Sequence, residues 1–328
     1  MYDPKLNLRQ TQQAIKVIKD TFQVLLAQNL HLERVTAPVL VAGNTGINDD
    51  LNGVERKVDF TVRNMGEAHA EVVQSLAKWK RMALSRYGFQ PGEGIYTDMN
   101  AIRRDDDLDA VHSIFVDQWD WEKVITRDQR TEAYLHDTVR RIAKAISDTN
   151  CLLRQKYPLL TVELNADVTF LTAQELFDRY PGMTAHQRED AVAEEFGTVF
   201  ISGIGAPLRN GMPHDGRAPD YDDWSLNGDL LYWDETLGRS LEISSMGIRV
   251  DAEALRRQLA AAGAEDRMRF EYHRAIAEDR LPLTIGGGIG QSRLCMLMLE
   301  KSHIGEVQVS VWPAEIVADC RARGIQLL

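Results

Sequence analysis

Apolar residues recur every three to four positions over several long stretches of this chain, as they do along one face of an amphipathic helix. The first stretch predicts a helix over residues 8–29, where Ile15, Ile18, Phe22 and Leu26 share a face. The same spacing predicts further helices over the ranges 129–156, 172–179 and 184–196, and two more within 251–280.

Other segments alternate apolar and polar residues, which is the pattern of a half-buried strand. The clearest is Val111–Trp121, and similar segments predict strands over the ranges 32–40, 54–62, 70–74, 198–202, 227–233, 239–243 and 307–312. Pro38 lies within the first of these ranges, and a proline in a strand favours a sheet edge or a subunit interface. Because strands come in runs rather than in strict alternation with helices, the pattern predicts an α+β fold with a central, mostly antiparallel sheet flanked by helices. No low-complexity linker or change of composition interrupts the chain, so we expect a single domain over residues 1–328.

A dense glycine run occurs near the end of the chain, in the segment Thr284–Arg293. We expect a tight turn between a strand and a helix here, because glycines let the backbone approach a ligand closely. The positive N-terminal end of the following helix and the permanent charge of Arg293 would then suit a phosphate-rich ligand. A structural turn with a surface arginine is an equally good interpretation of this stretch alone.

Acidic residues outnumber basic ones by 49 to 38 over 328 residues, which gives a net charge of −11 and a pI of about 5.3. A protein that binds nucleic acid through phosphate contacts usually presents a basic face, so the balance favours small ligands and no nucleic acid partner. The three cysteines are far apart and form neither a disulfide framework nor a zinc pattern, which is typical of a reducing cytoplasm. No apolar run reaches transmembrane length, so we expect a cytoplasmic protein with no membrane partner.

One face of the strand predicted at Val111–Trp121 carries two polar side chains. A period of two places Gln118 and Asp120 together, while Asp117 and Trp119 point to the other face. Charge in such a position is costly unless it is used, and an amide beside a carboxylate can hold an ammonium group. An exposed strand face is the alternative interpretation.

Arg103 and Asp106 flank a turn after a strand-like segment. The arginine could bind a phosphate bidentately, and the acid could accept a hydrogen bond from an adenine amine or orient the arginine. These residues alone favour the simpler interpretation, which is a solvated loop of arginines and aspartates.

Asp229 and Glu242 lie in two predicted strands joined by a short turn, so antiparallel pairing would bring the two carboxylates together. Beside a phosphate site they would suit Mg²⁺, which takes one or two carboxylates plus phosphate oxygens. Neutralisation by Arg239 and Arg249 is an equally good alternative. No cluster of histidines and cysteines suggests zinc.

Taken together, these segments resemble the class II aminoacyl-tRNA synthetases. The glycine run that ends at Arg293 resembles motif 3 of that class, Ile102–Asp106 resembles motif 2, and the Pro38 strand resembles motif 1, the dimer interface. The resemblance is closer still to one relative of the class, the ammonia-dependent asparagine synthetase family. Besides the glycine run, it rests on the segments Ser75–Arg81, Gly92–Gly94, Val116–Glu122, Arg217–Trp224, Leu226–Asp229 and Ser244–Val250.

The sequence departs from that family's pattern in two places. Gln74 stands where a histidine is usual, and the segment between Trp224 and Asn227 is shorter. The second departure affects a loop that would lie near the nucleotide and cover its pocket.

The resemblance implies a class II synthetase-like catalytic core that makes L-asparagine from L-aspartate, ATP and ammonia through a β-aspartyl-adenylate, with release of AMP and pyrophosphate. Such chemistry needs a charge clamp on the α-phosphate and no protein nucleophile. An aspartyl-tRNA synthetase-like core and a non-catalytic paralogue are the alternatives.

The implied roles fall into four groups. The catalytic residues would be Asp50, Arg103 and Arg293, with Asp50 as the base that takes a proton from ammonia. The residues that bind aspartate would be Asp50, Lys80, Gln118, Asp120 and Ser244. The residues that bind the nucleotide would be Arg103, Asp106, Asp222, Ser245, Gly288, Gly290 and Arg293. Asp229 and Glu242 would hold Mg²⁺, and the Pro38 strand region would form a homodimer.

Overall fold

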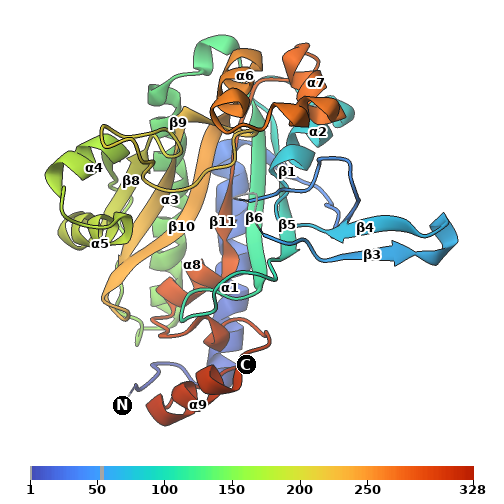
Figure 1. Ribbon diagram of the computed structural model, residues 1–328. Coiled ribbons are helices and arrows are strands. Elements are labelled where there is room, and N and C mark those ends of the chain that lie inside the picture. The colour runs from blue at the N-terminus through green and yellow to red at the C-terminus, as the bar shows by residue number, and fades with distance from the viewer. Residues whose placement is uncertain (1, 52–54) are drawn as a thin grey trace.

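The computed structural model describes residues 2–51 and 55–328, and one large sheet organises it (Figure 1). In chain order its eight strands are β1 (Leu32–Arg34), β5 (Gly94–Ile102), β6 (Phe115–Val124), β7 (Thr169–Thr172), β8 (Thr198–Ser202), β9 (Asp222–Asp234), β10 (Arg239–Arg249) and β11 (Thr284–Gly290). Their spatial order is β1-β5-β6-β11-β10-β9-β8-β7. The edge pairs β1–β5 and β7–β8 are parallel and the other pairs are antiparallel, so the predicted α+β class is confirmed.

Two long helices, α1 (Leu8–Leu30) and α3 (Glu132–Lys156), cover one face of this sheet (Figure 1). Their apolar faces and the strands beneath them form the main core, in which the rings of Phe22 and Trp119 lie 4.6 Å apart. Burying a side chain of this size stabilises the fold by roughly 1.5–3 kcal/mol. Helix α1 begins with a capping box at Asn7, whose side chain accepts a hydrogen bond from the Gln10 amide.

The remaining helices lie around the other face and the ends of the sheet (Figure 1). They are α2 (Ala77–Tyr87), α4 (Ala173–Arg179), α5 (Ala185–Phe196), α6 (Ala252–Ala261), α7 (Glu271–Ala277), α8 (Gln291–Met298) and α9 (Ala314–Arg323). The predicted helices at 8–29, 129–156, 172–179, 184–196 and within 251–280 are confirmed, each to within a few residues. None of the helices over residues 2–51 and 55–328 combines the length and the hydropathy that a bilayer span requires.

A small second sheet projects beyond β5 (Figure 1). Its strands β2 (Leu40–Ala42), β3 (Asp59–Val62) and β4 (Ala68–Val72) pair antiparallel in the order β2-β4-β3. The single strand predicted over 32–40 is therefore wrong, because β1 and β2 belong to different sheets and Pro38, which has no N–H to donate, lies between them. The strand predicted over 54–62 is confirmed only as β3, and its first residue, Val54, lies outside the described residues.

The glycine run is not a turn, as predicted, but strand β11 in the middle of the large sheet, between β6 and β10. The glycines are needed there because long side chains of the neighbouring strands lie across them. A β-carbon at Gly286 would collide with the Glu122 carboxylate, and one at Gly288 would collide with the Gln118 amide. Helix α8 follows directly, so the predicted succession of strand and helix is otherwise confirmed.

Three further strand predictions need correction. The segment 307–312 is not a strand in the described part of the chain: Val307 is buried, but Val309 and Val311 are 70% and 68% exposed, so the three do not form one buried face. Strands β9 and β10 are longer than the predicted 227–233 and 239–243, and β9 continues without interruption through the short segment 224–227. Strand β5 was not predicted, because its residues do not alternate clearly and nearly all of them are buried or half-buried.

Candidate active site

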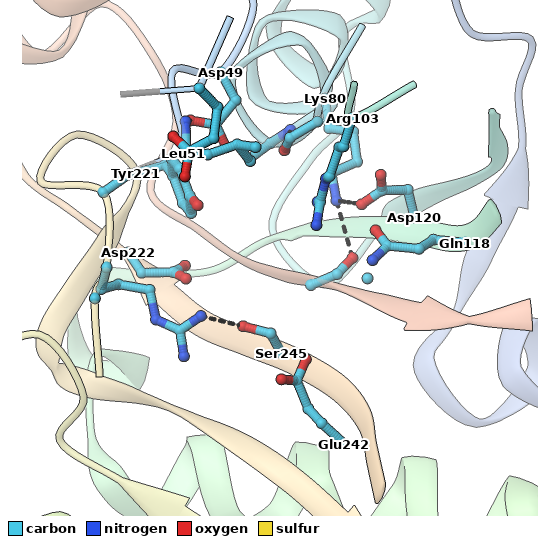
Figure 2. Close-up of a pocket in the computed structure, with 18 of the residues that line it drawn as sticks. Asp49, Leu51, Lys80, Arg103, Gln118, Asp120, Tyr221, Asp222, Glu242 and Ser245 are labelled. Carbon is cyan, nitrogen blue, oxygen red and sulfur yellow. Dashed lines mark hydrogen bonds and ion pairs between the residues drawn. The ribbon is translucent and has the colours of Figure 1, made fainter. Parts of the chain in front are cut away.

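A cavity of about 250 Å³ lies on the sheet face opposite α1, over β6, β11 and β10. The strand period of two creates it, because Trp119 points into the core against Phe22 while Gln118 and Asp120 point away from it (Figure 2). We call it the central cavity. Nine of the sequence-predicted site residues line it: Lys80, Arg103, Asp106, Gln118, Asp120, Asp222, Glu242, Ser245 and Gly288.

A second cavity of about 730 Å³ adjoins the first, and we call it the outer cavity. Residues that line both include Arg103, Asp106 and Glu242. The outer cavity also receives Gly290 and Arg293, which the sequence placed at the nucleotide. The two cavities together form a bipartite site, with a small compartment of mixed charge and a larger one that carries an arginine.

Three predicted residues line neither cavity: Asp50, Ser244 and Asp229. The Ser244 hydroxyl lies beneath the floor, where it donates a hydrogen bond of 2.9 Å to the carbonyl of Gly288. Its contribution is therefore to hold β10 against β11 rather than to face the space above them.

The loop after β2 presents Asp49, not Asp50, to the central cavity (Figure 2). Asp50 pairs with Lys57 at 2.7 Å and with Arg267 at 3.4 Å. Asp49 is 2% exposed, and its Oδ1 accepts a hydrogen bond from the amide of Leu51, whereas its Oδ2 has no hydrogen-bond partner among the described residues. Burial raises the pKa of the Asp49 carboxyl.

Gln74, which replaces the histidine usual in the resembled family, joins this loop to the arginine of motif 2. Its side-chain amide donates to the backbone carbonyl of Asp49 at 2.9 Å, and its backbone carbonyl accepts from the Arg103 guanidinium at 3.3 Å. Its backbone amide donates to Asn48 at 2.8 Å. Gln74 is fully buried, so this one residue fixes the acid and the arginine relative to each other.

Lys80, on α2, is the buried cation of the central cavity. Its ammonium pairs with Asp120 and donates a hydrogen bond of 2.9 Å to the carbonyl of Gly287 (Figure 2). Burial lowers the pKa of the Lys80 amine against the opposing effect of Asp120. The pair gives the cavity one charge of each sign, 1% and 3% exposed respectively.

A second set of paired charges surrounds Arg217, which precedes β9. Its guanidinium donates to Asp229 at 2.6 Å and to the Ser245 hydroxyl at 2.6 Å. Burial and the nearby Glu242 carboxylate outweigh Arg217 and raise the pKa of Asp229 to about 7. Asp229 is therefore held by a protein cation, while Glu242, with a side chain that is 43% exposed, stands 3.8 Å from Arg293.

Beneath these residues Arg249 forms a fully buried network. It donates to both oxygens of Glu122, at 2.8–3.1 Å, and pairs with Asp222. Glu122 also accepts from Thr284 at 2.7 Å. The network ties β6, β9, β10 and β11 together under the cavity, and Asp222 enters the site already paired.

In chemical terms the central cavity offers carboxylate, ammonium and amide groups within one small volume, which suits a zwitterion such as an amino acid. The outer cavity offers a guanidinium beside bare glycine backbone, which suits phosphates. Comparison with known proteins decides between the families that share such a site. The aspartate–ammonia ligase family model matches residues 9–324. The chain belongs to the aspartate–ammonia ligase family.

Relatives of this ligase family cover the whole chain. The aspartate–ammonia ligase of Levilactobacillus brevis is 54% identical over 327 residues, which is 100% of this chain and 98% of that protein. Those of Clostridium tetani and Bacillus cytotoxicus are also 54% identical, over 100% of this chain and 96% and 100% of theirs.

Solved structures with the same fold are tRNA synthetases. Asparaginyl-tRNA synthetase of Pyrococcus horikoshii, complexed with asparaginyl-adenylate, superposes with a TM-score of 0.69 at 16% identity, over 92% of this chain and 70% of that one. The Entamoeba histolytica asparaginyl-tRNA synthetase in complex with asparaginyl-adenylate gives a TM-score of 0.65 at 16% identity, over 92% and 66%. The class II-like fold is thus confirmed, and the tRNA synthetase alternative is not favoured, because the high identity lies with the ligases.

Sequence reasoning missed several residues that line the central cavity. The side chains or backbone that line the central cavity without having been assigned a role belong to Asp49, Leu51, Glu55, Ser75, Ala77, Gly216, Arg217, Ala218, Tyr221, Arg249 and Gly287. A signal existed for Arg217 and Tyr221, which stand in the quoted segment Arg217–Trp224. For Asp49 the only signal was its place beside Asp50, and a one-residue choice in a loop depends on backbone angles that the sequence does not give.

Proposed function

We propose that this protein makes L-asparagine from L-aspartate, ATP and ammonia through a β-aspartyl-adenylate, with release of AMP and pyrophosphate. The observation that carries the proposal is the junction of the two cavities at Arg103. The acid Asp49 and the Lys80–Asp120 pair lie in the central cavity, while Arg293 lies in the outer one. An amino acid and a nucleotide bound in these compartments would meet at Arg103.

Aspartate would lie in the central cavity. The ammonium group of aspartate would donate hydrogen bonds to Asp120 and to the side-chain oxygen of Gln118, and one carboxylate of aspartate would face Lys80. Lys80 already pairs with Asp120, so substrate would share this pair rather than find a free cation. The arrangement selects a ligand that brings both signs of charge, because a ligand of one sign would leave a buried partner unmatched.

ATP would span the outer cavity. Arg103 would clamp the α-phosphate and Arg293 the outer phosphates, because a guanidinium matches phosphate oxygens bidentately. The nucleoside would be bound by Asp106, Asp222 and Ser245. Gly288 and Gly290 would contribute only backbone atoms to the nucleotide site. The clamp stabilises negative charge that moves onto the leaving pyrophosphate, which is the main requirement of adenylation.

Mg²⁺ would accompany the nucleotide, held by Asp229 and Glu242. Among the described residues no cluster of three or more His, Cys, Asp or Glu side chains is arranged to hold a metal ion. Two carboxylates are sufficient for an ion that brings phosphate oxygens with it. Glu242 lines both cavities, whereas Asp229 would share its carboxylate between the ion and Arg217. The ion would supply charge neutralisation on the phosphates.

We assign the base of the ammonia step to Asp49 instead of Asp50. The nitrogen lone pair of NH₃ attacks the acyl carbon, the bond to the AMP oxygen breaks, AMP leaves with that electron pair, and one proton of the nitrogen passes to the base. Asp49 faces the cavity with a raised pKa and with an oxygen that has no hydrogen-bond partner among the residues that the structure describes, and both features favour proton acceptance. Asp50 is already paired with Lys57 and Arg267.

The assembly and surroundings are proposed on separate grounds. We infer a homodimer through the Pro38 region, where Val39 and Leu40 are 51% and 45% exposed. All three cysteines are free thiols, which supports a cytoplasmic protein. The net charge of −11 supports the absence of a nucleic acid partner.

The test is to incubate the purified protein with ATP, Mg²⁺, aspartate and ammonium, and to measure asparagine and AMP together. We expect equal amounts of the two products, and aspartate-dependent exchange of pyrophosphate into ATP without ammonium. Charging of tRNA with aspartate, or exchange without asparagine, would contradict the proposal.

A further inference from the structure

A third cavity, of about 480 Å³, lies on the other side of the segment 216–218 from the central cavity. We call it the side cavity. Leu51, Gly216, Arg217 and Ala218 line both spaces, so they form the wall between them. At Gly216 and Ala218 this wall carries no side chain or a single methyl group. The wall is therefore low in side-chain bulk at these two positions.

The central cavity needs a second approach once its first is filled. It joins the outer cavity along Arg103, Glu242 and Gly288, which is where aspartate and nucleotide would lie. Figure 2 shows Asp49 and Leu51 close together, across the cavity from Gln118 and Asp120. A nucleophile that reaches Asp49 from the Leu51 side does not have to pass the bound nucleotide.

The chemistry of the side cavity suits a small neutral molecule. Pro213, Pro219, Trp224, Ala262 and Ala264 supply uncharged walls. Both of its arginines are engaged with acids: Arg217 with Asp229 at 2.6 Å, and Arg267 with Asp220 at 2.8 Å. These ion pairs leave the arginines little net charge, and Asp215 is the other charged residue that lines this cavity. The uncharged walls favour NH₃ over NH₄⁺, because NH₃ has one heavy atom and no charge to desolvate.

The end of the path is marked by the buried acid. The Leu51 amide holds Asp49 Oδ1 at 3.1 Å, and Asp49 Oδ2 has no hydrogen-bond partner within residues 2–51 and 55–328. Leu51 itself adopts a left-handed backbone with φ of 49°, a conformation that is uncommon for a residue with a branched side chain. With this backbone conformation, the amide of Leu51 donates to Asp49 and Leu51 forms part of the wall between the two cavities.

We propose that ammonia reaches the aspartyl-adenylate as neutral NH₃ through the side cavity, by crossing the wall formed by Leu51, Gly216 and Ala218. The proton of ammonium stays in bulk water, and the step that follows at Asp49 is the one described above. This inference rests on the proposed function and adds a route that is separate from the one used by ATP and aspartate.

The first variant narrows the side cavity at a residue that does not line the central cavity. Ala262 is the residue that follows α6, and it lines the side cavity but not the central cavity, so Ala262→Trp should fill the route from its outer wall. Ala261→Trp is the matched control, because it adds the same bulk one residue earlier, at an exposed position that does not line this cavity. Ala218→Val adds bulk in the wall itself.

We expect Ala262→Trp to lower kcat/KM for ammonium roughly tenfold, while aspartate-dependent pyrophosphate exchange and Ala261→Trp stay at wild-type values. Ala218→Val should also lower kcat/KM for ammonium. It should lower kcat/KM for hydroxylamine by a larger factor, because hydroxylamine is a larger nucleophile. The KM of the wild type, expressed as NH₃, should stay constant across pH while the KM for total ammonium falls as pH rises.

Two results would overturn the route. One is a normal kcat/KM for ammonium in both Ala262→Trp and Ala218→Val. The other is a parallel loss of exchange in both variants, since the substitutions would then act on adenylation. Failure of the proposed function is distinguishable, because in that case the wild type itself would form no asparagine.

Discussion

A graded series of alanine substitutions along β11 follows from the distances between this strand and its neighbours. A β-carbon at Gly290 would lie 3.3 Å from the β-carbon of Arg293, which can shift slightly. A β-carbon at Gly288 would lie 2.8 Å from the amide carbon of Gln118, and one at Gly286 would overlap the Glu122 carboxylate. The three sites thus run from near tolerance to severe collision within five residues of one strand.

The cost at Gly286 is set by what the collision would break. Glu122 is fully buried and cannot turn away without losing the bidentate bond to Arg249 and the hydrogen bond from Thr284. Breaking a buried ion pair costs about 3–5 kcal/mol, so Gly286→Ala should lose about that much unfolding free energy. Gly288→Ala should lose about 1–3 kcal/mol, because overpacking displaces a side chain that borders a cavity. Gly290→Ala should stay within about 1 kcal/mol of the wild type, because the strand entropy gained from alanine offsets a mild contact.

Urea unfolding monitored by tryptophan fluorescence gives the three free energies, and the wild type is the reference. Gly288→Ala should in addition raise the KM for aspartate, because Gln118 would be pushed into the central cavity. Equal stability of all three variants would refute the reasoning, since a run that behaved as a flexible turn would accept alanine without regard to β6. A Gly286→Ala variant with the unfolding free energy of the wild type would by itself refute the reasoning.

Four other outcomes are expected. Asp49→Asn should keep aspartate-dependent pyrophosphate exchange but form little asparagine, whereas Asp50→Asn should retain most of both activities; the opposite result would return the base to Asp50. Gln74→Leu should lower kcat at least about tenfold, because the loop that carries Asp49 loses the hydrogen bond from the Gln74 side chain. The KM for ATP should change little, because the backbone carbonyl of residue 74 still accepts from Arg103, and an unchanged kcat would show that the side-chain bond is dispensable. The pKa of Asp229 is about 7 in the folded protein and about 3.9 in an unfolded chain. The contribution of this carboxyl to the free energy of unfolding is therefore full below about pH 4 and is lost as the pH rises to about 7. Over that pH interval, urea unfolding should show Asp229→Asn gaining stability relative to the wild type. Chelation of Mg²⁺ should stop pyrophosphate exchange, and Glu242→Gln should raise the Mg²⁺ concentration needed for half-maximal exchange; an unaltered requirement would remove Glu242 from the metal site.

Periodicity predicted the helices, the α+β class and the shared face of Gln118 and Asp120, because these depend on local spacing alone. It failed at the glycine run, since the reason for the glycines lies in Glu122 and Gln118 on another strand, more than 160 residues away in the case of each pair. The strand over 307–312 failed for the converse reason. Its apolar residues alternate in the sequence, but in the described structure no neighbouring strand pairs with them, and Val309 and Val311 are exposed.

The site was predicted to the level of segments and not always to the level of side chains. Asp120 was predicted because it is a charge in an otherwise costly position on a strand, whereas Arg103 and Lys80 were assigned through the family resemblance. Asp49 was exchanged for its neighbour because the left-handed backbone at Leu51 cannot be read from the sequence. The Arg217–Asp229 pair was missed because its two members come from different segments that only the fold brings together.

The small sheet β2-β4-β3 carries a consequence for heat resistance. It stands apart from the large core and exposes Phe60 and Leu40, yet Asn48, in the loop that leads to Asp49, is fastened to it through hydrogen bonds to Glu71 and to the carbonyl of Val72. Opening of this sheet would withdraw the acid while β6, β10 and β11 stay folded. Asparagine synthesis should accordingly fade on warming before the global Tm, with pyrophosphate exchange outlasting it, and amide hydrogen exchange in β3 and β4 should be fast where that of the large sheet is slow.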